Sequence, residues 1–237
     1  MKIYFLGTGT SQGIPVIGSK HSVCLSSDSK DKRLRVSVWI ETEDASIVID
    51  CGPDFRQQML TSKCERIDAL LFTHEHADHT AGLDDIRPFY FQQGDISVYA
   101  HQRVLTNLAK RFDYIFETEN KYPGAPSVST NKVVKNESFF VKNTAIIPID
   151  ALHGNLQIFG YKIQDFVYLT DVKTMSEEDF TFQTKQTSQE ILDKKDTILE
   201  MLDDENYYTE NGDLNISKIT KDLNTSRATV MSVLNGE

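Results

Sequence analysis

The sequence predicts an α/β protein built in layers, and two patterns carry this prediction. Short apolar segments of strand length alternate with helical segments over roughly the first three quarters of the chain, which is typical of α/β folds. The remaining part lacks strand-like apolar runs and shows helical spacing instead. A length of 237 residues allows one good core, or one large domain with a small appendage.

The expected elements follow one another in chain order. We expect strands at 2–6, 35–41, 46–50, 67–73, 96–100, 144–149, 158–163 and 166–170, and helices at 53–60 and 103–111. The run 67–73 is continuously apolar and ends in polar residues, as a buried strand does. Residues 11–33 are rich in Gly, Ser, Pro and Lys and show no period, which predicts a long loop of the kind that is usually functional.

The composition changes near residue 176. Residues 177–237 hold 14 acidic and 6 basic residues, a net charge of −8, whereas the first 176 hold 21 and 19, a net charge of −2. We therefore predict a domain at 1–176 and a helical segment at 188–237, with the boundary between 176 and 188. Helices are expected there at 189–202, 216–223 and 226–234.

The last two of these helices resemble a helix-turn-helix, with the turn at Asn224-Thr225 and a second helix that opens at Ser226. The pattern is short and common, and a net charge of −8 opposes contact with phosphates. We favour a small helical packing module over a DNA-binding one.

Bulk properties exclude several classes of protein. A net charge of −10 argues against a general binder of nucleic acids or anionic membranes, although bound dications can invert the local field towards a phosphorylated substrate. No run approaches the roughly 18 apolar residues of a membrane span, and the apolar N-terminus is too short for a secretory signal. Three cysteines, Cys24, Cys51 and Cys64, form no disulfide framework, so we expect reduced thiols and a cytoplasmic protein.

The strongest functional signal is the segment His74-Glu75-His76-Ala77-Asp78-His79. Three of the six histidines and one aspartate stand together there, directly after the expected buried strand at 67–73. Imidazole and carboxylate groups are the ligands that hold zinc or a similar divalent ion. A loop at the end of a strand can direct alternate side chains into one cleft, so the segment predicts a metal site and not a chance polar turn.

This segment resembles the His-x-His-x-Asp-His motif of the metallo-β-lactamase-fold hydrolases. The resemblance covers about residues 1–176 and implies an αββα sandwich and two divalent metal ions, zinc or manganese. It implies that the first metal is held by His74, His76 and His153, the second by Asp78 and His79, with Asp171 between the two. It also implies that Asp50 supports the segment 74–79, which we call the metal loop, from the side away from the metals.

The chemistry that the resemblance implies is hydrolysis through a metal-bound hydroxide, with Asp78, His76 and Asp171 as catalytic candidates. The opening 7–15 and the segment 82–87 resemble the phosphodiesterase branch, which includes phosphoribosyl 1,2-cyclic phosphate phosphodiesterases and, more distantly, tRNA 3′-processing endonucleases. We therefore predict a metal-dependent phosphodiesterase that acts on a small phosphoester.

The chain departs from this family in two ways. It has no histidine after His153 and no apolar strands after Asp171, so the second half of the sandwich is expected to be incomplete and the second metal site weak. Water, Cys51 or a neighbouring chain is available for the open position. The alternative hypothesis is a catalytically impaired protein that serves as a binding or regulatory module, with a link to DNA through its C-terminal helices. An uncovered sheet edge would favour a homodimer.

Two further positions leave alternatives open. Some family members bind a structural zinc through Cys-x-Cys-x-x-Cys where this chain has Ser19, His21 and Cys24, and a solvated loop with an idle thiol is the favoured interpretation here. Arg87 is a candidate for binding a substrate phosphate, or for an ion pair with Asp84 or Asp85.

Overall fold

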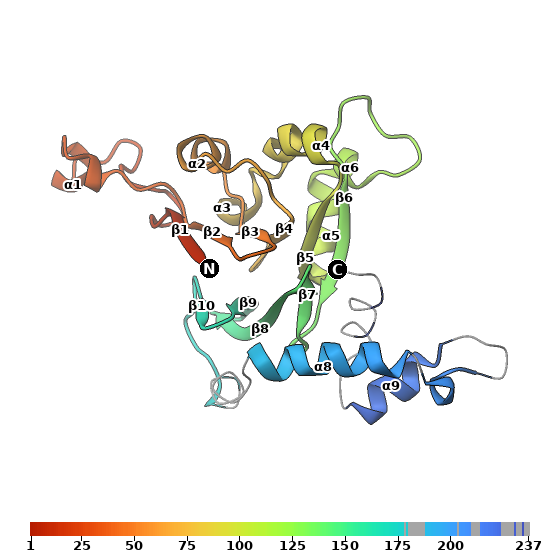
Figure 1. Ribbon diagram of the computed structural model, residues 1–237. Coiled ribbons are helices and arrows are strands. Elements are labelled where there is room, and N and C mark those ends of the chain that lie inside the picture. Colours follow the sequence, from red (N-terminus) through yellow and green to blue (C-terminus); the bar gives the residue numbers. More distant parts are fainter. Residues whose placement is uncertain are drawn as a thin grey trace. The chain divides into compact units, whose positions relative to one another are not determined.

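The computed structural model of the chain describes residues 1–177, 179, 188–202, 204–209, 214–223, 230 and 234 (Figure 1). It divides into two compact units, Met1–Lys132 and Val133–Glu237. No helix in the described ranges is long and apolar enough to cross a membrane.

The first unit is built on a six-stranded sheet. Its strands lie in the order β1 (Lys2–Gly7), β2 (Ser37–Glu41), β3 (Ser46–Ile49), β4 (Ala69–Leu71), β5 (Ile96–His101) and β6 (Val128–Val133). The first three strands pair antiparallel, and β3, β4 and β5 pair parallel. Every residue of β3 and β4 is buried, as the uninterrupted apolar runs predict.

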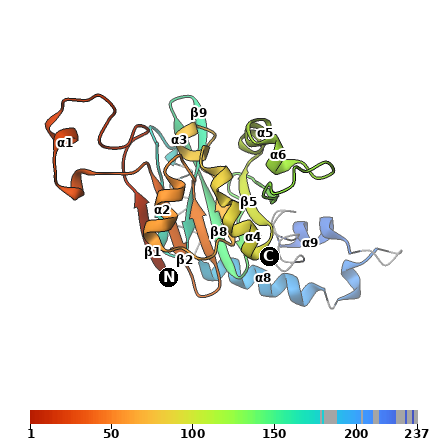
Figure 2. The same cartoon turned by 90° about the horizontal axis from the view of Figure 1, so that it is seen from above.

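Helices connect these strands. They are α1 (Ser22–Leu25), α2 (Phe55–Ser62), α3 (Ala77–Thr80), α4 (Arg87–Gln93), α5 (Gln102–Arg111) and α6 (Asp113–Phe116), with single 3₁₀ turns η1 (Ser29–Asp31) and η2 (Leu83–Ile86). Figure 2 shows α2, α4 and α5 grouped beside the sheet, whereas α1 lies apart on the long loop.

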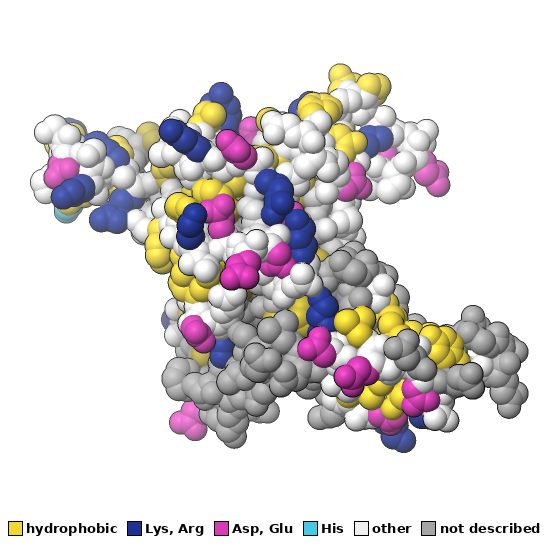
Figure 3. Space-filling model, viewed as in Figure 1, with side chains coloured by type: hydrophobic (Ala, Val, Ile, Leu, Met, Phe, Trp, Pro, Cys, Tyr) yellow, Lys and Arg dark blue, Asp and Glu magenta, His cyan; other side chains and the backbone are white. Residues whose placement is uncertain are grey.

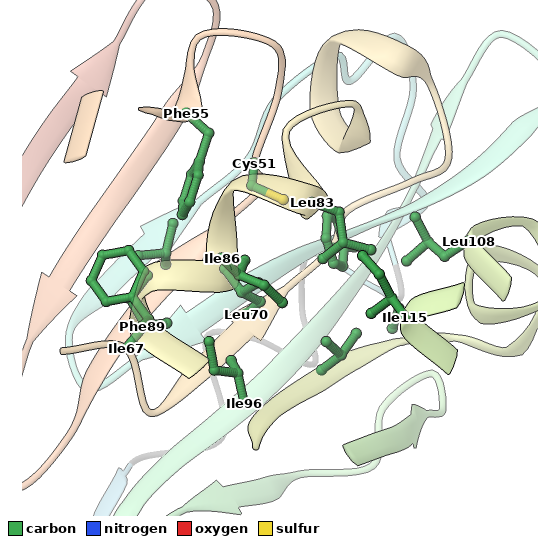
Figure 4. Close-up of a cluster of buried hydrophobic side chains, with 14 of the residues drawn as sticks. Cys51, Phe55, Ile67, Leu70, Leu83, Ile86, Phe89, Ile96, Leu108 and Ile115 are labelled. Atoms are coloured by element: carbon green, nitrogen blue, oxygen red, sulfur yellow. The ribbon is translucent and has the colours of Figure 1, made fainter. Parts of the chain in front are cut away.

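The core of this unit lies between the sheet and its helices. Residues of α2 and α5 alternate between buried and exposed at helical spacing, and their apolar sides face the strands. Figure 4 shows the cluster, which includes Cys51, Phe55, Ile67, Leu70, Leu83, Ile86, Phe89, Ile96, Leu108 and Ile115. Because η2 and α4 directly follow the His-rich segment, this core also anchors the C-terminal end of that segment.

The second unit contains a four-stranded antiparallel sheet in the order β10-β9-β8-β7. The strands are β7 (Phe139–Val141), β8 (Thr144–His153), β9 (Leu156–Ile163) and β10 (Phe166–Tyr168). The long pairing of β8 with β9 runs from Ile146 opposite Ile163 to His153 opposite Leu156, so His153 lies at the turn end of this hairpin.

The tail is helical where it is described, as the sequence predicts. It forms α8 (Ser188–Met201), the 3₁₀ turn η3 (Glu205–Tyr207) and α9 (Ile216–Asp222), and the described residues after 188 contain no strand beyond the isolated bridge of Tyr208 with Leu214. The expected turn at 224–225 and most of the expected helix 226–234 lie outside the described residues, so the helix-turn-helix stays a prediction, as does the boundary between 176 and 188.

The tail helices pack on the second sheet at β7 and β8. Ile198 and Ile219 join Phe140 and Ile147 in one buried cluster. Lys195 donates a hydrogen bond to the Asn143 side chain at 2.7 Å. A few well-placed apolar side chains thus suffice for this packing despite the acidic composition of the tail. The cover of the sheet edge after β10, and with it the homodimer, stays a prediction.

Among the elements that the sequence did not predict are α4, β6 and β7. The strand β6 carries alternating polar residues and β7 has only three residues, so neither presents the apolar run that signals a strand. The helix α4 has Pro88 in its first turn and aromatic residues in the next, a composition with weak helix propensity. Their formation depends on packing against the rest of the unit.

Candidate metal centre

The His-rich segment lies at the C-terminal end of β4, between two parallel neighbours. His76 is the N-cap of the short helix α3, which carries Asp78 and His79 in its single turn. This turn is stabilised by the Thr80 hydroxyl, which donates to the His76 carbonyl at 2.8 Å. Strand-end loops of this kind gather side chains at one edge of a sheet.

Asp50 is the central acceptor behind this loop. It follows β3, is completely buried and has a left-handed backbone with φ of 61°. Its carboxylate accepts hydrogen bonds from the Thr73 backbone N–H and the Thr73 hydroxyl, both at 2.8 Å, and from His79 Nδ1 at 2.7 Å. The strand-end aspartate therefore lies where the resemblance implies, behind the candidate ligands.

These contacts select one tautomer for the neutral form of two histidines. When neutral His79 donates from Nδ1 to Asp50, its Nε2 carries the lone pair. The single Thr73 hydroxyl proton goes to Asp50, so Thr73 Oγ1 can only accept from His74 Nδ1, 2.9 Å away. His74 Nε2 therefore also carries its lone pair, the form in which imidazole binds a metal.

The donor atoms lie at distances that suit shared ions. His74 Nε2 and His76 Nδ1 are 3.0 Å apart, and His79 Nε2 and Asp78 Oδ2 are 3.3 Å apart. Two nitrogens on one tetrahedral zinc ion lie about 3.3 Å apart, because Zn–N bonds are about 2.05 Å long. The imidazole and carboxylate groups of this unit thus fit a divalent ion in chemistry and in spacing.

In the second unit, the turn end of β8 and the segment after β10 bring the other two candidates together. His153 Nε2 lies 3.9 Å from Asp171 Oδ2, and both side chains are partly exposed. Asp171 has a left-handed backbone with φ of 57°, an uncommon conformation for a non-glycine residue that often marks functional sites. The convergence of this pair with the His-rich segment on shared ions stays a prediction.

Two arginines of α5 hold the metal loop from outside. Arg103 forms a bidentate ion pair with the Glu75 carboxylate at 2.7 and 3.1 Å. Burial raises the pKa of Glu75, but the hydrogen bonds and charge of Arg103 outweigh it and leave the pKa below its usual value. Arg111 donates to Thr80 Oγ1 at 2.7 Å and to the Glu75 carbonyl at 3.1 Å. Sequence analysis missed both, because separations of 28 and 36 residues leave no local signal.

The structure bears on three of the alternatives left open by the sequence. Arg87 forms the ion pair with Asp84, at 2.8 Å. The Cys51 side chain lies in the core cluster, and burial raises the pKa of its thiol well above the usual value, so it does not fill the open ligand position. No group of three potential ligands in the described residues includes His21 or Cys24.

The glycines near the N-terminus serve the chain's own packing. A Cβ atom on Gly7 would lie 1.9 Å from the Arg35 carbonyl oxygen, and one on Gly9 would lie 2.7 Å from that of Arg33. The lack of a side chain thus lets β1 and its following turn approach the segment before β2.

We expect Asp50→Asn to weaken metal binding about 10- to 100-fold, the usual cost of losing a partner behind a ligand. An amide NH₂ in place of Oδ2 would make Thr73 an acceptor and would move the His79 proton to the metal-facing nitrogen. Asparagine tolerates positive φ, so backbone strain is not the cause. Zinc and manganese titrations by calorimetry measure the effect.

Asp68→Asn is the matched control for this substitution. Asp68 accepts the Ser46 backbone N–H at 2.8 Å at the opposite end of β3. It should lose some stability and keep the metal affinity. An Asp50→Asn protein with wild-type affinity would show that the Asp50 network does not orient the ligands.

The comparisons with known proteins show the superfamily of this chain. The beta-lactamase superfamily domain matches residues 45–207. A Porphyromonas gingivalis protein named octanoyltransferase is 42% identical over 180 residues, which are 76% of this chain and 36% of that protein. Ribonuclease Z of Bacillus licheniformis is 30% identical over 171 residues, 70% of this chain and 49% of that enzyme. The chain thus spans between about a third and a half of these relatives.

Among solved structures, a diphosphatase from the PhnP family superposes with a TM-score of 0.68 and 35% identity. The match covers 76% of this chain and 68% of that one. The α/β architecture expected from the sequence is confirmed by this superposition and by the domain match.

Proposed function

The chain belongs to the metallo-β-lactamase superfamily, and we propose that it is a metal-dependent hydrolase of phosphodiester-type substrates. The observation that carries this proposal is the Asp50 network, which holds the Nδ1 atoms of His74 and His79 on the side of Asp50 and Thr73 at one strand end. The sequence similarity to ribonuclease Z and the structural similarity to a PhnP-family diphosphatase support phosphodiesters as the substrate class.

In this proposal His74, His76 and His153 hold one divalent ion, and Asp78 and His79 hold a second, with Asp171 shared. When bound, such ions activate a water molecule and neutralise charge on phosphoryl oxygens. Zinc and manganese both suit a nitrogen and carboxylate ligand set. The second position has fewer histidines than the first, so we propose that it binds more weakly.

The chain's own residues contribute orientation. Asp50 and Thr73 keep the protons of His74 and His79 on the nitrogens that face away from the metal. These ligands therefore need not reorient when a metal ion binds. The ion pair of Arg103 with Glu75 keeps the loop in place between the ligands His74 and His76. Contacts of this kind, formed before a substrate binds, hold reacting groups in position.

The test is hydrolysis of bis-p-nitrophenyl phosphate by the purified chain, first stripped with chelator and then supplied with manganese or zinc. We expect no turnover without metal and restored turnover with it. Magnesium, which prefers oxygen ligands, should restore less. A rate equal to the buffer background with every metal would contradict the proposal and favour the alternative of a binding or regulatory module.

A second candidate function is favoured by the relative named octanoyltransferase. The matched segment is only 36% of that protein, so a domain like this chain shares a polypeptide with other sequence. A polarising metal ion can also promote attack on a thioester carbonyl. Octanoyl-coenzyme A in the same assay separates the candidates: turnover of the thioester alone would replace the phosphodiester proposal.

A further inference from the structure

The long loop before β2 forms a projecting arm with exposed apolar side chains. We define the arm as residues 15–33; it contains α1 and η1 and lies apart from the other elements of its unit in Figures 1 and 2. Ile17 is 98% exposed and Leu25 69% exposed.

The arm is nevertheless an ordered structure. Two backbone hydrogen bonds of 2.8 Å between Ile14 and Arg33 close its base. His21 caps α1 through a hydrogen bond from the Val23 N–H, and Asp28 caps η1 through one from Lys30. Neither helical turn contains a buried residue. An ordered projection without a core of its own leaves its apolar side chains available to a partner.

The charge of the arm indicates the partner's chemistry. The arm holds four basic and two acidic residues, a net charge of +2, whereas the whole chain carries −10. Figure 3 shows lysine and arginine groups on the arm, at the left of the view. A basic, apolar projection on an acidic chain is complementary to a further copy of the same chain.

The same unit contains a pocket whose apolar and slightly acidic lining is complementary to the apolar and basic arm. It has a volume of about 600 Å³ and lies between α2 and α4. Its apolar lining comes from Met59, Leu60, Cys64, Pro88 and Phe89, and its charged lining from Arg56, Glu65 and Asp85. The volume accommodates large aliphatic side chains, and the lining carries one more acidic than basic residue. Since Ile17 is almost fully exposed, the arm does not occupy the pocket of its own chain.

We propose that the arm docks on a second copy of this chain, with Ile17 and Leu25 of one copy in the α2–α4 pocket of the other. The contact is reciprocal, so two identical arms and two identical pockets close a symmetric dimer. Lys20 on the arm then meets Glu65 at the pocket. This inference is independent of the proposed hydrolase activity.

Light scattering after size exclusion tests the proposal on the full chain at micromolar concentration. We expect a mass of twice 26.9 kDa for the wild type. Ile17→Asp should raise the dimer dissociation constant at least about tenfold, as for a residue at the centre of an interface. Because the Ile17 side chain is 98% exposed, this variant should keep the wild-type circular dichroism. Tyr122→Asp changes a residue that is 68% exposed outside arm and pocket, and it should leave the dimer intact.

A charge swap identifies the pocket. Lys20→Glu and Glu65→Lys should each weaken the dimer, and the two together should restore it, because the exchanged charges attract again. A monomeric wild type, a dimer that survives Ile17→Asp, or equal effects of Ile17→Asp and Tyr122→Asp would overturn the proposal. Single charge variants whose effects simply add would overturn the assignment of the pocket.

Discussion

His76→Ala is expected to remove metal-dependent phosphodiesterase activity while the protein remains folded. His76 is exposed, so its loss opens no cavity, whereas His74 is completely buried and its replacement would mix catalytic and folding effects. Loss of a direct ligand should cost more than the roughly 10- to 100-fold expected for a residue behind the ligands. Hydrolysis of bis-p-nitrophenyl phosphate with added manganese, together with a thermal melt, measures both quantities.

His101→Asn is the matched control for His76→Ala. His101 caps α5 by accepting a hydrogen bond from the Arg103 N–H at 3.1 Å, and asparagine preserves such a cap. The control should keep both activity and stability. Comparable losses in the two variants would indicate that general damage, and not loss of a ligand, explains the result for His76→Ala.

The same assay tests the ligands in the second unit. If His153 shares an ion with His76, His153→Ala should lower activity and metal affinity as strongly as His76→Ala does. Both side chains are accessible enough for substitution without a large packing cost. Wild-type affinity in the His153→Ala protein would remove His153 from the metal centre.

The sequence predicted the elements whose periodicity is strong and local. The strand 67–73 and the histidines after it form one continuous signal, and the structure has β4 and the candidate ligands in that order. The strand-end Asp50 followed from the family resemblance. Its three hydrogen bonds did not, because Thr73 and His79 are 23 and 29 residues away. Contacts over such separations depend on the parallel pairing of β3 with β4.

Other features escaped prediction because tertiary packing decides them. The tail is acidic and polar in composition, yet Ile198 and Ile219 pack on β7 and β8. Composition averages over a segment, whereas packing depends on which face carries the apolar residues. The role of Arg87 could not be predicted either, since two acidic neighbours and a substrate phosphate are equivalent partners in the sequence. The structure selects Asp84, which also accepts from the Tyr114 hydroxyl at 2.9 Å.

Gly52→Ala should damage both folding and the metal site, because Gly52 packs directly against the backbone of the metal loop. A Cβ atom at this position would lie 1.9 Å from the Asp78 carbonyl oxygen. That oxygen belongs to the backbone and cannot rotate away as a side chain would, so α3 must move. Overpacking costs about 1–3 kcal/mol and occasionally more, and we expect a loss of at least about 3 kcal/mol here.

The displacement caused by Gly52→Ala would reach the ligands through backbone hydrogen bonds. Cys51 N–H donates to the His79 carbonyl at 2.8 Å, and Gly82 N–H donates to the Cys51 carbonyl at 2.9 Å, so α3 and the residue that follows its C-cap are both tied to Cys51, the neighbour of Gly52. Urea unfolding and metal titration measure the two effects. Gly124→Ala is the control: it has open space and a φ of 86°, so it should cost about 1–2 kcal/mol from the left-handed backbone alone and leave the metal affinity unchanged. If Gly52→Ala bound metal as tightly as the Gly124→Ala control, the close packing of Gly52 on the loop would not be what positions Asp78 and His79.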